Sequence, residues 1–117
     1  MKIHLFEKDQ LAELVPAGTT VFRKGDQGDL MFAVVDGQVD IVIRGKVVET
    51  VESGGVFGEM ALVEDRPRVA TAIVKADAKL VRIDRARFVF LVQQNPYFAL
   101  QLMTIMSERL RRMDERL

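Results

Sequence analysis

The chain has 117 residues, of which 49% are hydrophobic, and its 17 basic residues balance 17 acidic ones; this composition suits a single domain, residues 1–117, and argues against a general nucleic-acid-binding protein. The absence of cysteine excludes disulfides and thiolate metal sites. Because the N-terminus is charged and no apolar run approaches membrane-spanning length, we expect a soluble, cytoplasmic protein that binds no membrane.

Short apolar segments separated by glycine fill the chain from about residue 11 to residue 83. Strands are predicted at 19–22, 32–35, 39–43, 47–51, 70–74 and 79–83. Asp36-Gly37 is typical of a tight hairpin turn, so we expect the second and third of these strands to form a hairpin. A further turn is predicted at Arg44-Gly45-Lys46. Many short strands at regular spacing favour an antiparallel β-sandwich or roll.

A glycine-led segment, FGEMALVEDRPRVAT at residues 57–71, lies between two of these strands. Gly58 lets the backbone come close to a ligand, and residues 59–62 can form the first turn of a short helix, whose unpaired N–H groups attract an anion. Arg68 offers a planar fork of donors to two phosphate oxygens. Glu59 offers an acceptor to sugar hydroxyls. The segment therefore predicts a small ligand with one phosphate and one ribose.

The chain from about residue 84 to residue 117 has helical periodicity. Asp84 is the predicted N-cap of a first helix, and Asn95-Pro96 ends that helix and begins a second one. Two apolar stripes run along the predicted second helix. The first is a heptad seam of Ala99, Met103, Met106, Leu110, Met113 and Leu117. The second stops before Arg109 and consists of Phe98, Leu102 and Ile105. We expect the first half of this helix to pack on the strands, and the second half to face a ligand or a partner.

The segment 57–71 and its flanking strands resemble the cyclic nucleotide-binding domain family, which includes the catabolite activator protein and the regulatory subunits of cAMP-dependent protein kinase. The matching pattern is Gly-Glu-x-Ala-Leu, a turn, and Arg-x-Ala-Thr. Residues 15–29 and 31–39 resemble the family's opening strands, so the likeness covers nearly all of the chain. It implies a mainly β fold: an antiparallel β-roll (a jelly roll, or double-stranded β-helix) with a phosphate-binding cassette and C-terminal helices.

The resemblance also implies roles for individual residues. In the family the glutamate binds the ribose 2′-hydroxyl and the arginine pairs with the cyclic phosphate, and here these positions are Glu59 and Arg68. Backbone amides of the turn and of Val69 complete the cradle. Threonine or serine follows the arginine in cGMP-preferring relatives, so Val69 implies cAMP as the favoured ligand and cGMP as a second one. The implied binding residues are Phe57, Gly58, Glu59, Met60, Ala61, Arg68, Val69 and Ala70.

We expect a stand-alone sensor or regulatory module of bacterial type, with no catalytic residues and no metal site. The sequence has no arrangement of Ser/His/Asp, Cys/His or paired carboxylates for a reaction, and its single histidine, His4, is remote from the cassette. The family likeness implies that the last helix closes over the base and forms a homodimer or binds a partner protein. It also implies that Arg109, Arg111 or Arg112 reaches the purine.

One alternative stays open at this point. A structural or protein-interaction β-roll that binds no nucleotide would carry the same strands. In that case Glu59 and Arg68 would be no more than a surface ion pair across a loop.

Overall fold

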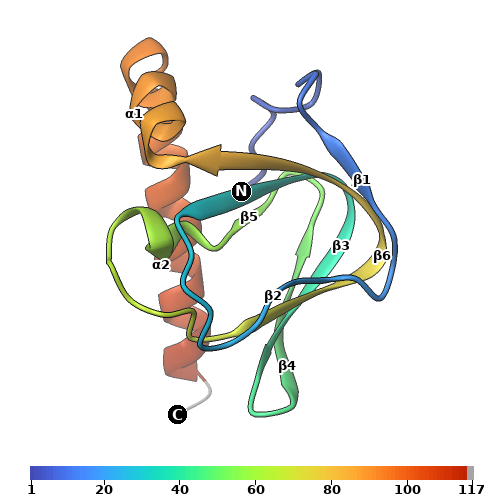
Figure 1. Ribbon diagram of the computed structural model, residues 1–117. Helices are drawn as coiled ribbons and strands as arrows, with labels where there is room; N and C mark the ends of the chain where they lie inside the picture. Colours follow the sequence, from blue (N-terminus) through green and yellow to red (C-terminus); the bar gives the residue numbers. More distant parts are fainter. Residues whose placement is uncertain (116–117) are drawn as a thin grey trace.

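Strands and a short 3-10 helix precede two α-helices in the computed structural model, which describes residues 1–115 (Figure 1). The elements are β1 (Glu13–Val15), β2 (Thr20–Phe22), β3 (Leu30–Ile43), β4 (Lys46–Glu52), β5 (Val56–Phe57), η1 (Glu59–Leu62), β6 (Thr71–Asp84), α1 (Arg85–Gln94) and α2 (Tyr97–Glu115). All strand pairs are antiparallel. The predicted β-roll with C-terminal helices is confirmed.

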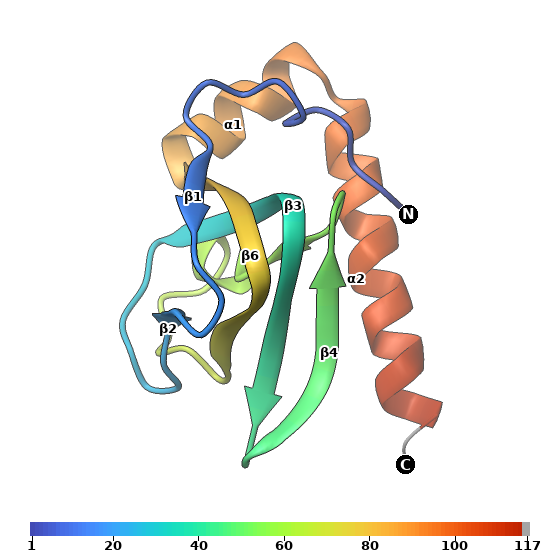
Figure 2. The same ribbon diagram turned by 90° about the vertical axis from the view of Figure 1, so that its right-hand side faces the viewer.

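The two long strands, β3 and β6, form the centre of the roll. They pair with each other from Leu30↔Asp84 to Val42↔Thr71. Strand β4 pairs with the second half of β3, whereas β1 and β2 pair with different parts of β6. Both long strands curve as they cross the molecule (Figures 1 and 2), so each one contributes residues to both walls of the roll.

The predicted hairpin at Asp36-Gly37 is wrong, because the chain continues there as the single strand β3. Its register against β6 shifts at three steps between Val34 and Val39, and Gly37 has a φ of 87°. A Cβ at Gly37 would lie 2.3 Å from the carbonyl oxygen of Asp77 in β6. The two strands therefore bend against each other at this point, as strands do at the corner of a roll.

The separate strands predicted at 70–74 and 79–83 are likewise parts of one strand, β6. The true hairpin turn lies between β3 and β4. There Arg44 and Gly45 have φ values of 54° and 76°, and Ile43 pairs with Lys46, so the predicted turn at this place is confirmed.

The core consists of two clusters. One fills the roll, where the rings of Phe32 and Phe57 stack with their centroids 5.1 Å apart. The other lies between the roll, the helices and the N-terminal segment, around the fully buried Phe98 of α2. Leu102 and Ile105 are buried in the same cluster. This burial confirms that the first half of α2 packs on the roll.

The first helix begins where the sequence predicts, and the second begins one residue later than predicted. The Asp84 side chain accepts a hydrogen bond of 2.8 Å from the amide of Arg87 and so caps α1. The second helix, α2, starts at Tyr97, one residue after Pro96. Its other apolar stripe is largely in solvent, because Met103, Leu110 and Met113 are exposed; Leu117, predicted to end this stripe, lies outside the described residues. No helix within residues 1–115 is both long and apolar enough to cross a membrane.

Candidate functional site

The cassette is built around Gly58, which stands between β5 and η1. Its φ of 76° is in the left-handed region, where glycine is favoured. The following residues, Glu59–Leu62, form a single 3-10 turn in which the amide of Ala61 donates to the Gly58 carbonyl. This confirms the short helix predicted after Gly58.

Arg68 reaches back to this turn from the other end of the cassette. Its Nη1 donates to the carbonyl of Gly58 at 3.0 Å and its Nη2 to the carbonyl of Leu30 at 2.6 Å. The guanidinium lies 4.0 Å from the centroid of the Phe22 ring, which is cation–π distance. A Cβ at Gly28 would come within 2.6 Å of its Nε, and one at Gly58 within 2.9 Å of its Nη1. Two glycines therefore make the room that this guanidinium occupies.

One donor of the Arg68 side chain lacks a hydrogen-bond acceptor within the described part of the chain. This donor is the buried Nε. Burial lowers the pKa of Arg68 below its usual value, against the opposing charges of Asp29, Asp26 and Glu59. A buried donor without an acceptor is unfavourable, and an anionic oxygen beside this guanidinium would satisfy it.

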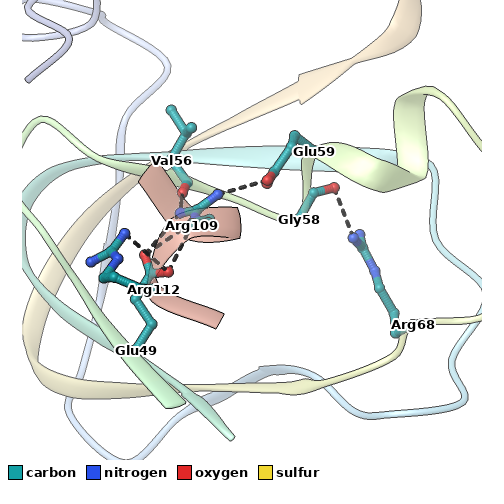
Figure 3. A network of polar contacts seen from close by, with 7 residues as sticks. All are labelled: Glu49, Val56, Gly58, Glu59, Arg68, Arg109 and Arg112. Atoms are coloured by element: carbon teal, nitrogen blue, oxygen red, sulfur yellow. Dashed lines mark hydrogen bonds and ion pairs between the residues drawn. The ribbon is translucent and has the colours of Figure 1, made fainter. Parts of the chain in front are cut away.

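Glu59 points to the opposite side of the Gly58 peptide, toward α2 (Figure 3). It is only 8% exposed. Arg109 of α2 donates from Nη1 to Glu59 Oε1 at 2.6 Å, and from Nη2 to the carbonyl of Val56. Arg109 also holds Glu49 of β4 with two donors, Nε to Oε1 at 2.9 Å and Nη2 to Oε2 at 3.0 Å. One guanidinium thus joins the cassette, the roll and the last helix.

The charges in this network are largely out of water. Burial by itself lowers the pKa of Arg109, but the carboxylates of Glu59 and Glu49 outweigh it and raise the pKa above its usual value. Arg109 therefore stays charged at any physiological pH. Arg112 adds a more distant cation, with its Nη2 3.8 Å from Glu49 Oε1, and its side chain is 51% exposed.

The remaining predicted site residues divide into two groups. The side chains of Phe57 and Ala70 are apolar and buried, so these residues can offer a polar ligand only their backbone groups. Met60 is exposed and Ala61 half-buried. Val69 is 72% exposed and turns its side chain to solvent. The eight residues thus lie along one cassette, but the side chains that could contact a ligand are those of Glu59 and Arg68, with Met60 and Val69 at its surface.

The alternative of a simple surface pair between Glu59 and Arg68 is wrong. Glu59 is buried and its ion pair is with Arg109, and no ion pair joins it to Arg68 in the described structure. Of the three arginines proposed to reach the purine, Arg109 contacts the cassette, Arg112 approaches Glu49, and Arg111 is exposed.

Sequence reasoning missed Glu49 and Phe22. Phe22 belongs to a strand of ordinary composition, so nothing in the motif marks it as the partner of Arg68. Glu49 carries a weak signal: it stands two residues before the buried Val51 in β4, and alternate residues of a strand face the same side. A carboxylate on the inner face of a roll needs a cation as partner. The arginines of α2 are candidates for that cation, so this requirement could have indicated the contact with α2.

A groove of about 320 Å³ lies on the Arg68 side of the cassette. Its lining includes Phe22, Gly28, Arg68, Leu80 and Arg82, and it does not reach Glu59. The cavity and the buried carboxylate therefore lie on different sides of the Gly58 peptide.

The roll, the cassette and the C-terminal helices together define a β-roll domain of the kind that carries a phosphate-binding cassette. The sequence profile described as "Cyclic nucleotide-binding domain" matches residues 12–95. The chain belongs to the cyclic nucleotide-binding domain family.

Solved structures agree with this assignment. The catabolite activator protein of Thermus thermophilus is 28% identical with a TM-score of 0.77, over 90% of this chain and 52% of that one. A cAMP-bound PfPKA-R (141–441) is 27% identical with a TM-score of 0.74, over 89% and 36%. A protein from work on a cyclic-GMP-dependent signalling pathway in bacterial phytopathogenesis is 29% identical with a TM-score of 0.65, over 90% and 81%. The chain thus spans about half of the first of these proteins and about a third of the second.

Proposed function

We propose that this chain is a non-catalytic sensor or regulatory module that binds a cyclic nucleotide at the cassette, with cAMP favoured over cGMP. The observation that supports this most strongly is the placement of a guanidinium and a buried carboxylate on opposite sides of one glycine peptide. A cyclic nucleotide presents an anionic phosphate fused to a ribose that keeps its 2′-hydroxyl. The two side chains match these two groups.

In the proposed complex, Arg68 pairs with the phosphate and Glu59 accepts a hydrogen bond from the ribose 2′-hydroxyl. Backbone amides of residues 58–61 and of Val69 complete the phosphate cradle. The orphaned Nε of Arg68 supports the first role, since a phosphate oxygen would be its acceptor. The burial of Glu59 supports the second, since a buried acceptor discriminates strongly between a ligand that carries a donor and one that lacks it.

The preference for cAMP rests on Val69, which has no hydroxyl to bond a guanine edge. The similar structures do not favour either nucleotide. PfPKA-R is bound to cAMP, whereas the phytopathogenesis protein comes from work on a cyclic-GMP-dependent pathway, and the two are nearly equally identical to this chain in sequence.

The module acts through its last helix in this proposal, and it does so in the cytoplasm. Arg109 connects the cassette to α2, and the exposed stripe with Met103, Leu110 and Met113 offers a surface for a second copy or a partner protein. The proposal of a non-catalytic role follows the family, whose members are generally regulatory. The single histidine, His4, is hydrogen-bonded to Glu7 in the exposed N-terminal segment.

A second candidate is a β-roll that binds no nucleotide and serves as a structural or protein-interaction domain. The contact of 2.6 Å between Arg109 and Glu59 favours it, because this guanidinium competes with a ribose for the carboxylate.

Calorimetric titration of purified protein, stripped of co-purified nucleotide by unfolding and refolding, distinguishes the two candidates. We expect binding of both cAMP and cGMP, with the tighter binding for cAMP. In Glu59→Gln, the difference between cAMP and 2′-deoxy-cAMP should shrink. If neither nucleotide binds the wild-type protein, the proposed function is wrong and the structural candidate is favoured; if cGMP binds more tightly, the inference from Val69 is wrong.

A further inference from the structure

Two carboxylates share the single guanidinium of Arg109, and they share it unequally. Glu49 receives the two-donor edge, with Nε on Oε1 at 2.9 Å and Nη2 on Oε2 at 3.0 Å. Glu59 receives one donor, Nη1, on its Oε1 at 2.6 Å. Two-donor pairing of arginine with a carboxylate is both stronger and more directional than a single bond. Glu49 therefore sets the orientation of the guanidinium, together with the carbonyl of Val56, which also accepts from Nη2.

The position of Glu49 is itself well fixed. Its Cα pairs with Ile41 in the β3–β4 ladder, and the next residue, Thr50, donates from its hydroxyl to Asp40 of β3 at 2.7 Å. Arg112 stands beside Glu49 Oε1 at 3.8 Å and adds a second positive charge. Glu49 therefore stays in place while Arg109 is shared with Glu59.

The two carboxylates compete because both are desolvated. The side chains of Arg109 and Glu49 are each 18% exposed and that of Glu59 is 10% exposed. Because little water reaches these side chains, losing one of the ion-pair contacts is energetically costly. If Glu49 were neutral, Glu59 would be the stronger of the two acceptors for Arg109. The fork would then turn to Glu59 and occupy both of its oxygens.

We propose that Glu49 is a positioning residue of the nucleotide site, which keeps one oxygen of Glu59 available to the ribose by holding the fork of Arg109 away from it. This inference rests on the proposed function. Glu49 acts through Arg109 and touches no ligand. The oxygen that it preserves is Glu59 Oε2, because Arg109 donates to Oε1.

A purely structural role for Glu49 makes a different prediction. If Glu49 only ties β4 to α2, its loss weakens every cyclic nucleotide by the same factor. If Glu49 preserves the ribose acceptor, its loss removes the preference for the 2′-hydroxyl. The informative quantity is therefore the ratio of dissociation constants for 2′-deoxy-cAMP and cAMP.

The test compares this ratio by calorimetry in wild type, Glu49→Gln and Glu52→Gln. Glu52 is the matched control, since it lies on the same strand, loses the same charge and is exposed, bonded to Gln38. We expect 2′-deoxy-cAMP to bind wild type and Glu52→Gln at least about tenfold more weakly than cAMP, as for a lost hydrogen bond to a charged group. In Glu49→Gln the ratio should fall toward one.

The double variant Glu49→Gln/Arg109→Gln gives an independent test, because it removes the competitor together with the residue that restrains it. Its ratio should return to the wild-type value, and this holds even if Glu49→Gln alone is too unstable to assay. A wild-type ratio in Glu49→Gln, or a double variant whose ratio stays near one, would overturn the inference while leaving the proposed function intact. If wild type binds no cAMP, the proposed function fails and this inference fails with it.

Discussion

Replacing Arg109 with methionine should destabilise the domain far more than the same replacement at Arg112. Methionine keeps much of the apolar stem but removes the charge, which leaves Glu59 and Glu49 without their shared partner in a largely dry site. Removing one member of a buried ion pair costs about 3–5 kcal/mol; because Arg109 and Glu49 keep some exposure, we expect about 3 kcal/mol. For a domain of this size that corresponds to a melting temperature about 12 °C lower.

Arg112→Met is the matched control for this prediction. Arg112 lies on the same helix, is 51% exposed, and approaches Glu49 only to 3.8 Å. An exposed pair of this kind contributes about 0–1 kcal/mol, so its melting temperature should change by no more than about 4 °C. Scanning calorimetry on the three proteins measures the difference. If the two variants lose the same stability, the network around Arg109 does not hold α2 on the roll, and the reasoning from burial is refuted.

Three further predictions concern the ligand. Arg68→Ala should weaken cAMP binding at least about tenfold in calorimetry, because a charged partner of the phosphate is lost, and Arg68→Lys should restore only part of it; unchanged affinity in Arg68→Ala would contradict the assignment. Val69→Thr should shift the preference toward cGMP by about 1 kcal/mol, the contribution of one hydrogen bond, and competition binding would show no shift if the residue does not face the base. Nucleotide should slow hydrogen exchange across residues 105–115, because Arg109 links the cassette to α2; identical exchange with and without cAMP would mean that α2 does not respond.

The sequence was sufficient for most of the fold, because local signals and tertiary structure agree there. Glycines placed the cassette, and Asp84 and Asn95-Pro96 placed the two helices. The stripe with Phe98 identified the face of α2 that is buried. It failed at the corner of the roll. Asp36-Gly37 is also a good hairpin sequence, and only pairing with the distant Asp77 region of β6 decides that the chain bends there without reversing.

The candidate site was only half accessible from the sequence. Glu59, Arg68 and the Gly58 turn are close in the chain, so their spacing was informative. Glu49 and Arg109 are 60 residues apart, and their contact arises only when α2 folds back across the roll. Local spacing cannot report such a contact. The same limit explains why three arginines were equal candidates until the structure brought Arg109 to Glu59.

Amide chemical shifts measured by NMR during titration with cAMP would test the central claim most directly. If the nucleotide binds at the cassette, the largest saturable changes should fall on residues 58–61 and 68–70, with smaller changes around Arg109. The groove of about 320 Å³ between Arg68 and Arg82 provides the competing location. Changes centred on its far lining, Glu13, Leu80 and Arg82, with residues 58–61 unaffected, or no saturable change at all, would contradict the account.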